Sequence, residues 1–192
     1  CLDDLASLLA AFAGRGSNTL GARTTRDVVA RWRTLGLATV EPYPGQGPGV
    51  VLPTARAAAI THQARPKPPS WTDTPHTLTT AAVAARYLSH GGGSWTAETM
   101  LRATLPKGEH LPDGLWRPPS GAVVAVEVER NGKASDRWAG IAAHLLAHYA
   151  STHYWLSEGT RPAWERWAES NLTPADRARL RVYSIEAQGV AR

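Results

Sequence analysis

The segment HLPDGLWRPPSGAVVAVEVERNGK, residues 110–133, decides the fold that we expect for this chain. A Pro-Asp-Gly turn at 112–114 leads through two further prolines into residues 122–130, whose valine-rich composition is typical of a buried strand. Side chains alternate across a strand, so Glu127 and Glu129 share one face and the even-numbered valines share the other. The segment therefore predicts a strand that carries two carboxylates on the same side.

Two carboxylates in adjacent same-face positions of an apolar strand require an explanation, because a buried carboxylate is costly unless it is paired, hydrogen-bonded or bound to a metal. A divalent cation is one explanation, with Asp113 of the preceding turn as a further ligand. The other is an edge strand whose polar face contacts water. Spacing alone leaves both explanations open.

The composition is that of a globular protein with a basic balance. The chain has 192 residues, enough for one domain or two small ones, and 43% of them are hydrophobic, which is enough for a core. The formal net charge of +5 favours an acidic partner, with nucleic acid as the first candidate, although 16 acidic residues temper the excess.

The single cysteine, Cys1, excludes an internal disulfide framework and the usual cysteine-based zinc sites. With no signal peptide and no long apolar run, the sequence predicts a soluble cytoplasmic protein without a membrane span. The chain begins with Cys1 rather than methionine and enters a helical pattern at once. We therefore expect that an upstream segment precedes it and that the first domain lacks its first helix.

Residues 1–65 show the element order of a winged helix-turn-helix. Helical patterns at 2–13 and 25–35 are followed by short strands at 37–41 and 50–52 and by a helical run that opens at 53. The segment RWRTLGLATVEPYPGQGPGVVLPTARAA resembles the recognition helix, wing and closing helix of that large family. The resemblance implies a DNA reader whose second helix enters the major groove of double-stranded DNA.

The second helical pattern and the residues just before it carry four arginines that we expect to contact DNA: Arg23, Arg26, Arg31 and Arg33. Residues 1–65 hold seven Arg or Lys against four Asp or Glu, a modest local excess. Two alternatives stay open: the arginines form a solvated helix face, or the unit makes protein contacts without DNA.

Residues 66–75, PKPPSWTDTP, hold four prolines and no apolar periodicity, and they predict a semi-rigid linker. The second domain then spans 76–192. Its patterns predict an α/β fold with a central sheet. The expected elements are a helix at 77–89, a helical turn opened by Ser94 or Thr96 through 101, the strand at 122–130, and then a helix at 136–150, a strand at 152–156, a helix at 162–170 and a strand at 180–185.

A Pro-Asp turn, a strand ending in acidic residues and a helix after it resemble the PD-(D/E)XK nuclease fold, a mixed sheet flanked by helices in which an upstream helix supplies a further Glu. Asp113 matches the first part of the motif, Glu127 the second, and Glu98 falls where the helical Glu would lie. More narrowly, a winged helix followed by TAAVAARYLSHGGGSWTAETML, HLPDG and VAVEVERNGK resembles the actinobacterial replication-relaxation proteins.

This resemblance implies metal-assisted phosphodiester hydrolysis. Asp113 and Glu127 would hold Mg²⁺ or Mn²⁺, Glu129 would orient a water or join a second metal, and Lys133 would offset charge on the phosphate. The sequence departs from the pattern in one place, because Glu129 stands where the motif has its lysine. Glu occurs at this place in active restriction enzymes of the fold, and Lys133 could fold back, yet many members of the fold have lost the chemistry.

Glu98 has an alternative to its role in the site, because a glutamate at this position is equally consistent with a surface or capping residue of its helix. His144 and His148 are four residues apart on one helix but lack a third ligand of clear spacing, so they do not predict a zinc site.

Three functions follow from the sequence. The first is a DNA-binding accessory protein of plasmid or mobile-element replication or transfer, with replication or conjugation proteins as partners and a homodimer as one expected assembly. The second is an active metal-dependent DNA endonuclease. The third is a protein-interaction module that binds no DNA.

Overall fold

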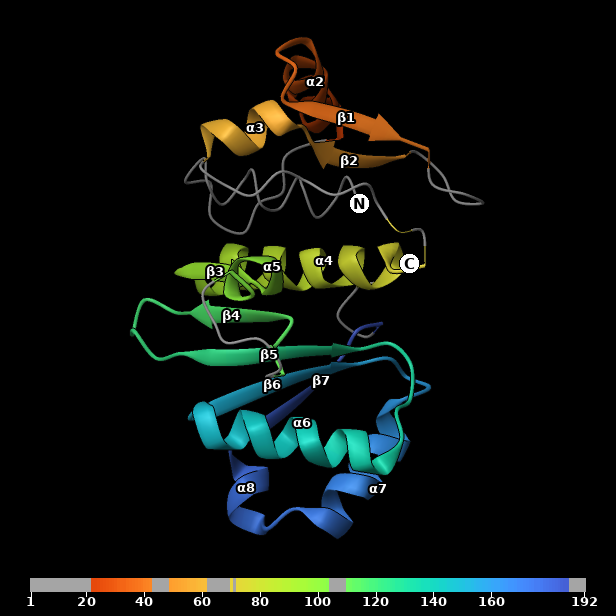
Figure 1. Ribbon diagram of the computed structural model, residues 1–192, viewed down its shortest axis with the longest axis vertical. Coiled ribbons are helices and arrows are strands. Elements are labelled where there is room, and N and C mark those ends of the chain that lie inside the picture. Colours follow the sequence, from red (N-terminus) through yellow and green to blue (C-terminus); the bar gives the residue numbers. More distant parts are fainter. Residues whose placement is uncertain (1–21, 43–48, 62–69, 71, 104–109, 187–192) are drawn as a thin grey trace. The chain divides into compact units, whose positions relative to one another are not determined.

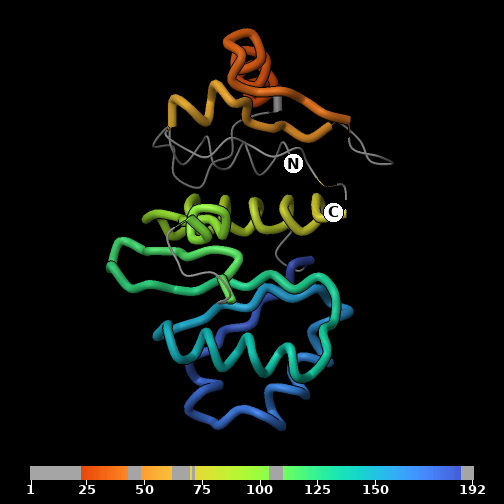
Figure 2. Tube along the Cα trace, viewed as in Figure 1, coloured from red at the N-terminus to blue at the C-terminus, as the bar shows by residue number. Residues whose placement is uncertain are grey.

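The computed structural model shows a chain that divides into two compact units, Cys1–Leu78 and Thr79–Arg192, and each is described by itself (Figures 1 and 2). The predicted helix at 2–13 and half of the predicted linker at 66–75, namely residues 66–69 and 71, lie outside the residues that the structure describes. None of the described helices is both long and apolar enough to cross a bilayer. The described residues are 22–42, 49–61, 70, 72–103 and 110–186.

The first unit contains helix α2 (Ala22–Thr34), which ends at a glycine cap. Gly36 has a φ of 67°, a conformation that glycine adopts without a Cβ penalty. Its N–H donates to the carbonyl of Arg33 at 3.0 Å, and the N–H of Leu37 donates to the carbonyl of Trp32 at 2.8 Å. These are the paired bonds of a Schellman motif, and they turn the chain directly from the helix into a strand.

Strands β1 (Ala38–Glu41) and β2 (Val50–Pro53) form an antiparallel pair that leads into helix α3 (Ala55–Ile60). The Thr54 hydroxyl accepts the N–H of the third residue of α3 at 3.2 Å and donates to the carbonyl of Gly36 at 2.7 Å. One side chain therefore caps α3 and ties its start to the end of α2. The predicted order of helix, two strands and helix is confirmed in this part of the chain.

The second unit is built on a five-stranded mixed sheet with the order β3-β4-β5-β6-β7. The pairs β3–β4 and β4–β5 are antiparallel, and the pairs β5–β6 and β6–β7 are parallel. The predicted α/β architecture is thus confirmed, and the strand expected at 122–130 lies at the centre of the sheet. The strands are β3 (Ser94–Ala97), β4 (Gly114–Arg117), β5 (Val124–Glu129), β6 (Ser151–Leu156) and β7 (Leu180–Ser184).

Helices cover both faces of this sheet (Figure 1). Val83 of α4 packs against the even-numbered valines of β5, whereas Trp138 of α6 and Trp164 of α7 lie in the cluster that contains Ala125. The alternation expected for β5 therefore holds, with the valines on the α4 face and the glutamate positions on the α6–α7 face. The helices are α4 (Thr74–Gly91), α5 (Glu98–Leu101), α6 (Ser135–His148), α7 (Arg161–Asn171) and α8 (Pro174–Ala178).

Two expectations about local structure were wrong. The helical turn expected to open at Ser94 or Thr96 begins only at Glu98, because Ser94–Ala97 form strand β3. β3 pairs with β4, and neither of these strands was predicted from the sequence. Trp95 stands directly opposite Trp116 in this pair, and a Cβ on Gly114 would lie 2.0 Å from the ring of Trp95. Glycine at 114 is therefore required by the close packing of this ring.

Candidate functional site

Glu127 and Glu129 lie on the central strand β5, and each residue is 2% exposed. The alternative of an edge strand with a wet polar face is therefore wrong. Burying an ionised carboxylate costs several kcal/mol unless charge or hydrogen bonds compensate it. The surroundings of the two glutamates supply such partners, and they come from the residues predicted for the site and from one that was not.

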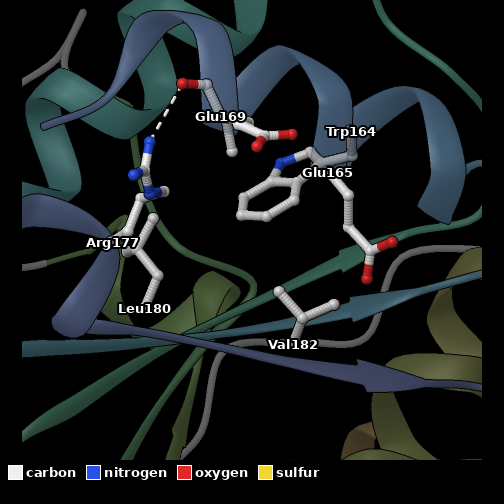
Figure 3. A pocket seen from close by; sticks show the side chains of 7 residues that line it. Trp164, Glu165, Glu169, Arg177, Leu180 and Val182 are labelled. Atoms are coloured by element: carbon white, nitrogen blue, oxygen red, sulfur yellow. Dashed lines mark hydrogen bonds between the residues drawn. The ribbon is translucent and has the colours of Figure 1, made fainter. Parts of the chain in front are cut away.

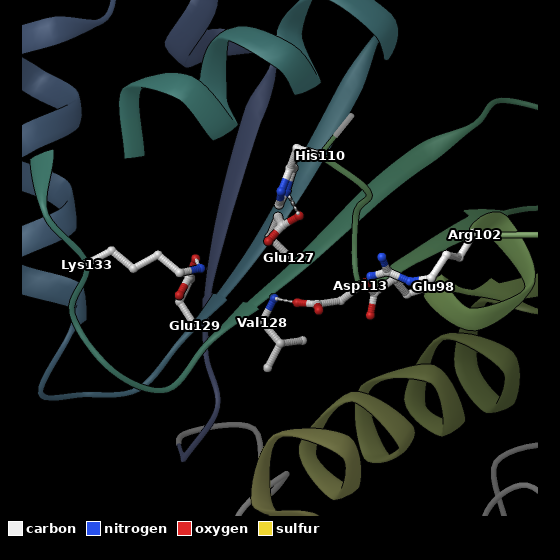
Figure 4. Close-up of polar contacts among 8 residues, drawn as sticks. All are labelled: Glu98, Arg102, His110, Asp113, Glu127, Val128, Glu129 and Lys133. Carbon is white, nitrogen blue, oxygen red and sulfur yellow. Dashed lines mark hydrogen bonds and ion pairs between the residues drawn. The ribbon is translucent and has the colours of Figure 1, made fainter. Parts of the chain in front are cut away.

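Glu127 is bonded to His110, whose Nε2 lies 2.8 Å from Glu127 Oε1 (Figure 4). With Glu127 ionised the carboxylate can only accept, so His110 donates an Nε2–H. Burial lowers the pKa of His110 below its usual 6.5, and the charge of Lys133 lowers it further. Three carboxylates oppose this shift: Asp113, Glu129 and Glu98. All five predicted catalytic residues thus bond to His110 or act on it electrostatically.

Glu129 forms an ion pair with Lys133, four residues further along the chain (Figure 4). The Lys133 side chain is 21% exposed and that of Glu129 is 3% exposed, so the pair is largely shielded from water. The turn after β5 does bring Lys133 back to the strand, as the sequence allowed. The lysine therefore stands beside the carboxylates although it does not occupy the usual position of the motif.

Asp113 lies at the bend before β4. Its carboxylate accepts a backbone N–H of β5 at a point where β4 no longer pairs with that strand. Regular pairing of β4 with β5 ends at Gly114 and Val126, and two residues further along β5 the N–H of Val128 donates to Asp113 Oδ2 at 2.7 Å. The carbonyl of Asp113 accepts the N–H of Glu98 at 3.2 Å. Asp113 is thereby fixed on the backbone between the two glutamates and is joined to the first residue of α5.

Glu98 combines the two roles that the sequence left open. Its backbone places it beside Asp113, but its side chain forms an ion pair with Arg102 one turn later in the chain. The side chains are 36% and 67% exposed, and exposed pairs of this kind contribute little stability. Glu98 therefore lies at the rim of the cluster and not among its buried carboxylates.

Two residues of the site were missed by the sequence interpretation. His110 was not among the predicted site residues, and its bond to Glu127 depends on the path of the chain before Asp113. Tyr154 of β6 is 1% exposed and stands in register with Glu127. Burial raises the pKa of Tyr154, and the negative charges of Glu127 and Glu129 raise it further. No local pattern predicts this contact, because it follows from the register of two parallel strands.

The histidines of α6 do have a third histidine nearby. The rings of His144 and His148 stack with their centroids 4.2 Å apart, and the ring of His110 lies 6.1 Å from that of His144. Within the residues that the structure describes, however, no group of three or more His, Cys, Asp or Glu side chains is arranged to hold a metal ion.

The donor chemistry of Asp113 and Glu127 fits a hard cation. Mg²⁺ is commonly bound by one or two carboxylates together with waters and substrate phosphates, so it does not need a complete protein cage. In the protein alone, the positive charge of Lys133 and the N–H of His110 compensate the buried acid. An ion at Asp113 and Glu127 would add to this compensation.

The arginines of α2 are all exposed. Thr25 and Val29 of the same helix are buried, and at about 3.6 residues per turn Arg23 and Arg31 fall on the opposite side, whereas Arg26 and Arg33 flank the buried face. This arrangement suits contact with a polyanion, and it equally suits a solvated helix face. The arginines are Arg23, Arg26, Arg31 and Arg33.

No protein-family model, curated protein or solved structure matches the chain, so a function has to be inferred from its own residues.

Proposed function

We propose that the chain is a DNA-binding accessory protein of plasmid or mobile-element replication or transfer, in which a winged helix-turn-helix binds double-stranded DNA and a nuclease-like unit binds Mg²⁺ or Mn²⁺ through Asp113 and Glu127. One observation carries the proposal. Glu127 and Glu129 are buried at the centre of the sheet, and Asp113 is bonded to the backbone between them. Burying two carboxylates on a central strand gains no stability over apolar residues, which favours a functional reason for them.

Hydrogen bonds and an ion pair within the protein would preorganise the carboxylates of this site in the absence of a metal ion. The N–H of Val128 holds Asp113 in place, and His110 orients the carboxylate of Glu127. Lys133 forms an ion pair with Glu129 and so holds its carboxylate in place. When bound, the ion would polarise a phosphate oxygen and lower the pKa of a coordinated water.

The arrangement of Lys133 supports an accessory role over catalysis. In the nuclease pattern the lysine two residues after the acidic residue activates water, whereas here Glu129 occupies that place and pairs with Lys133. The lysine charge thus compensates a buried carboxylate of the protein. A phosphate would have to compete with Glu129 for it.

A metal-dependent DNA endonuclease is the second candidate, and one observation favours it. Lys133 folds back far enough for its charge to lower the pKa of His110, which is bonded to Glu127. A lysine at this distance from the carboxylates could stabilise charge that develops on a phosphate. Cleavage assays separate this candidate from the first.

Metal binding is tested by thermal unfolding of the full chain in Mg²⁺ and Mn²⁺. An ion that binds only the folded state adds about 2.7 kcal/mol at a hundred times its dissociation constant, so the melting temperature should rise. Asp113→Asn and Glu127→Gln should remove the rise, and Glu158→Gln, a change in an exposed turn, should keep it. Stabilisation with Mn²⁺-dependent cleavage of DNA would select the endonuclease. No stabilisation by either ion would exclude the metal site.

DNA binding is tested by a mobility-shift titration over a range of salt concentrations. Replacing Arg26, Arg31 and Arg33 by Ala should remove most of the affinity. The dependence of log affinity on log salt should fall by about 0.9 for each DNA phosphate that the variant no longer neutralises. A matched triple variant in the second unit should leave affinity unchanged; its exposed positions are Arg117, Arg137 and Arg166. Equal affinity of both variants and the parent would favour a protein-interaction module.

A further inference from the structure

Helix α2 carries charges of both signs on the face furthest from its buried side. Thr25 and Val29 are buried, and at about 100° per residue Asp27 lies opposite the midpoint between them. Arg23 precedes Asp27 by about one turn and Arg31 follows it by about one turn, and all three residues are exposed. The charges along this face therefore alternate: positive, negative, positive.

The carboxylate at the centre of this face makes no contact of its own. Opposite charges four residues apart on a helix commonly pair with each other. In the second unit charged side chains of this kind do bond within the protein, since Arg161 pairs with Glu165 at 2.6 Å and Arg177 donates to the carbonyl of Glu169 at 2.9 Å (Figure 3). In the described part of the chain, no hydrogen bond or ion pair engages the side chain of Asp27 or the two arginines beside it. All three groups are therefore available to a ligand.

A carboxylate in this position restricts what the face can contact on DNA. Facing the sugar-phosphate backbone, Asp27 would be repelled by the phosphate charges. Facing base edges in the major groove, it would accept a hydrogen bond from the N4 amino group of cytosine. Adenine also presents an amino group there, but beside the acceptor N7, which a carboxylate disfavours. The charge pattern thus favours contact with bases over contact with phosphates.

The other exposed residues of α2 fit the same arrangement. Arg26 and Arg33 are seven residues apart, close to two full turns, so they lie in one row along the side of the helix. Such a row suits the phosphates of one DNA strand at the border of the groove. Ala30 is exposed and lies between this row and Asp27, and its methyl group does not hold bases away from the helix.

We propose that α2 selects DNA by sequence through Asp27, which accepts from a cytosine amino group in the major groove. Arg23 and Arg31 donate to the O6 and N7 acceptors of guanines in neighbouring base pairs. Arg26 and Arg33 hold phosphates and carry no sequence information. This inference rests on the proposed DNA binding and names the class of site that it selects, a segment of G·C base pairs with a cytosine facing Asp27.

The test is a binding selection with the full chain on duplexes that contain a randomised central segment, followed by sequencing of the bound fraction. The parent should enrich cytosine at one position by about tenfold, with guanine at neighbouring positions. Asp27→Asn should change the preferred base at that position to adenine, because an asparagine amide bonds to adenine N6 and N7 together. Asp27→Ala should abolish the preference at that position alone. The control Asp136→Asn, an exposed position on α6, should keep the parent motif.

A mobility-shift titration then separates base contacts from phosphate contacts. Arg26→Ala should weaken binding to the selected duplex and to a shuffled duplex by the same factor and lower the salt slope by about 0.9. Arg31→Ala should weaken binding to the selected duplex more than to the shuffled one. The inference is overturned, with DNA binding intact, if the parent binds DNA without a preferred base or if both Asp27 variants keep the parent motif. A parent that binds no duplex at any salt concentration would overturn the proposed DNA binding itself, and this inference with it.

Discussion

At the scale of single residues, the ion pair of Lys133 with Glu129 stabilises a buried carboxylate on the central strand. Replacing Lys133 by Met retains the stem of the side chain but removes the charge beside a carboxylate that is 3% exposed. We expect a loss of about 2 kcal/mol in the free energy of unfolding, below the value for a fully buried pair because Lys133 retains some contact with water. Urea unfolding measures the loss.

The matched background for this experiment is Glu129→Gln, which removes the buried charge and keeps the shape of the side chain. In that background the Lys133→Met change should cost much less, because no carboxylate remains to be compensated. An equal cost in both backgrounds would show that Lys133 acts through packing alone.

The sequence predicted the acidic residues of the site and Lys133, but it did not predict that His110 and Tyr154 lie beside Glu127. Strand alternation alone places Glu127 and Glu129 on one face. His110 lies beside Glu127 because of the path of the turn before β4. Tyr154 lies beside Glu127 because of the register of β5 against β6. The path of the turn and the register both depend on contacts between residues that are distant in the sequence. Periodic patterns within one segment of the sequence therefore cannot predict these contacts.

At the scale of elements, α4 is fastened to the sheet by a polar contact inside an aromatic cluster. The hydroxyl of Tyr87 in α4 lies 2.6 Å from His153 Nδ1 and accepts the indole N–H of Trp155 at 3.0 Å. Tyr87 therefore donates to a neutral His153. Burial lowers the pKa of His153 to about 4, and the charge of Arg181 contributes to the shift.

This lowered pKa predicts how stability depends on pH. Between about pH 6.5 and 4 the unfolded chain binds a proton at His153 and the folded protein does not, so the free energy of unfolding falls as the pH falls through this range. The full contribution is about 3 kcal/mol, since each pKa unit corresponds to about 1.4 kcal/mol. His153→Gln retains an acceptor for Tyr87 and should flatten the profile between pH 6.5 and 5, measured by urea unfolding. A profile parallel to that of the parent would contradict this assignment.

In the second unit the long elements were predictable, whereas the short strands β3 and β4 were not. The apolar periodicity of α6 and the valine run of β5 appear in the sequence because each buries a complete face. β3 and β4 have four residues each, and each is stabilised by pairing with the other. The ring of Trp95 packs against Gly114 across this pair. Pairing of this kind leaves no periodic signal within one short strand.

At the scale of the whole molecule, the division between the two compact units falls inside α4, after Leu78. The start of this helix is held by Ser70, whose carbonyl accepts the N–H and the hydroxyl of Thr74 at 2.8 and 2.7 Å. A fragment of residues 70–192 should therefore fold alone and unfold in urea in a single transition. A fragment of residues 79–192, which lacks the first turn of α4, should be less stable by about 1 kcal/mol. Equal stability of the two fragments would show that this turn contributes nothing.

The order of the strands in the sheet is the same as their order along the chain. Each strand therefore finds its neighbour in the segment made just before it, and sheet formation never has to wait for a distant part of the polypeptide. The two parallel pairs still join residues 27 and 28 positions apart, as Val124 with Ser151 and Thr152 with Leu180 show, and parallel pairing of this kind forms more slowly than a hairpin. During synthesis the sheet can grow in one direction from β3, with β7 joining last as the ribosome completes the domain.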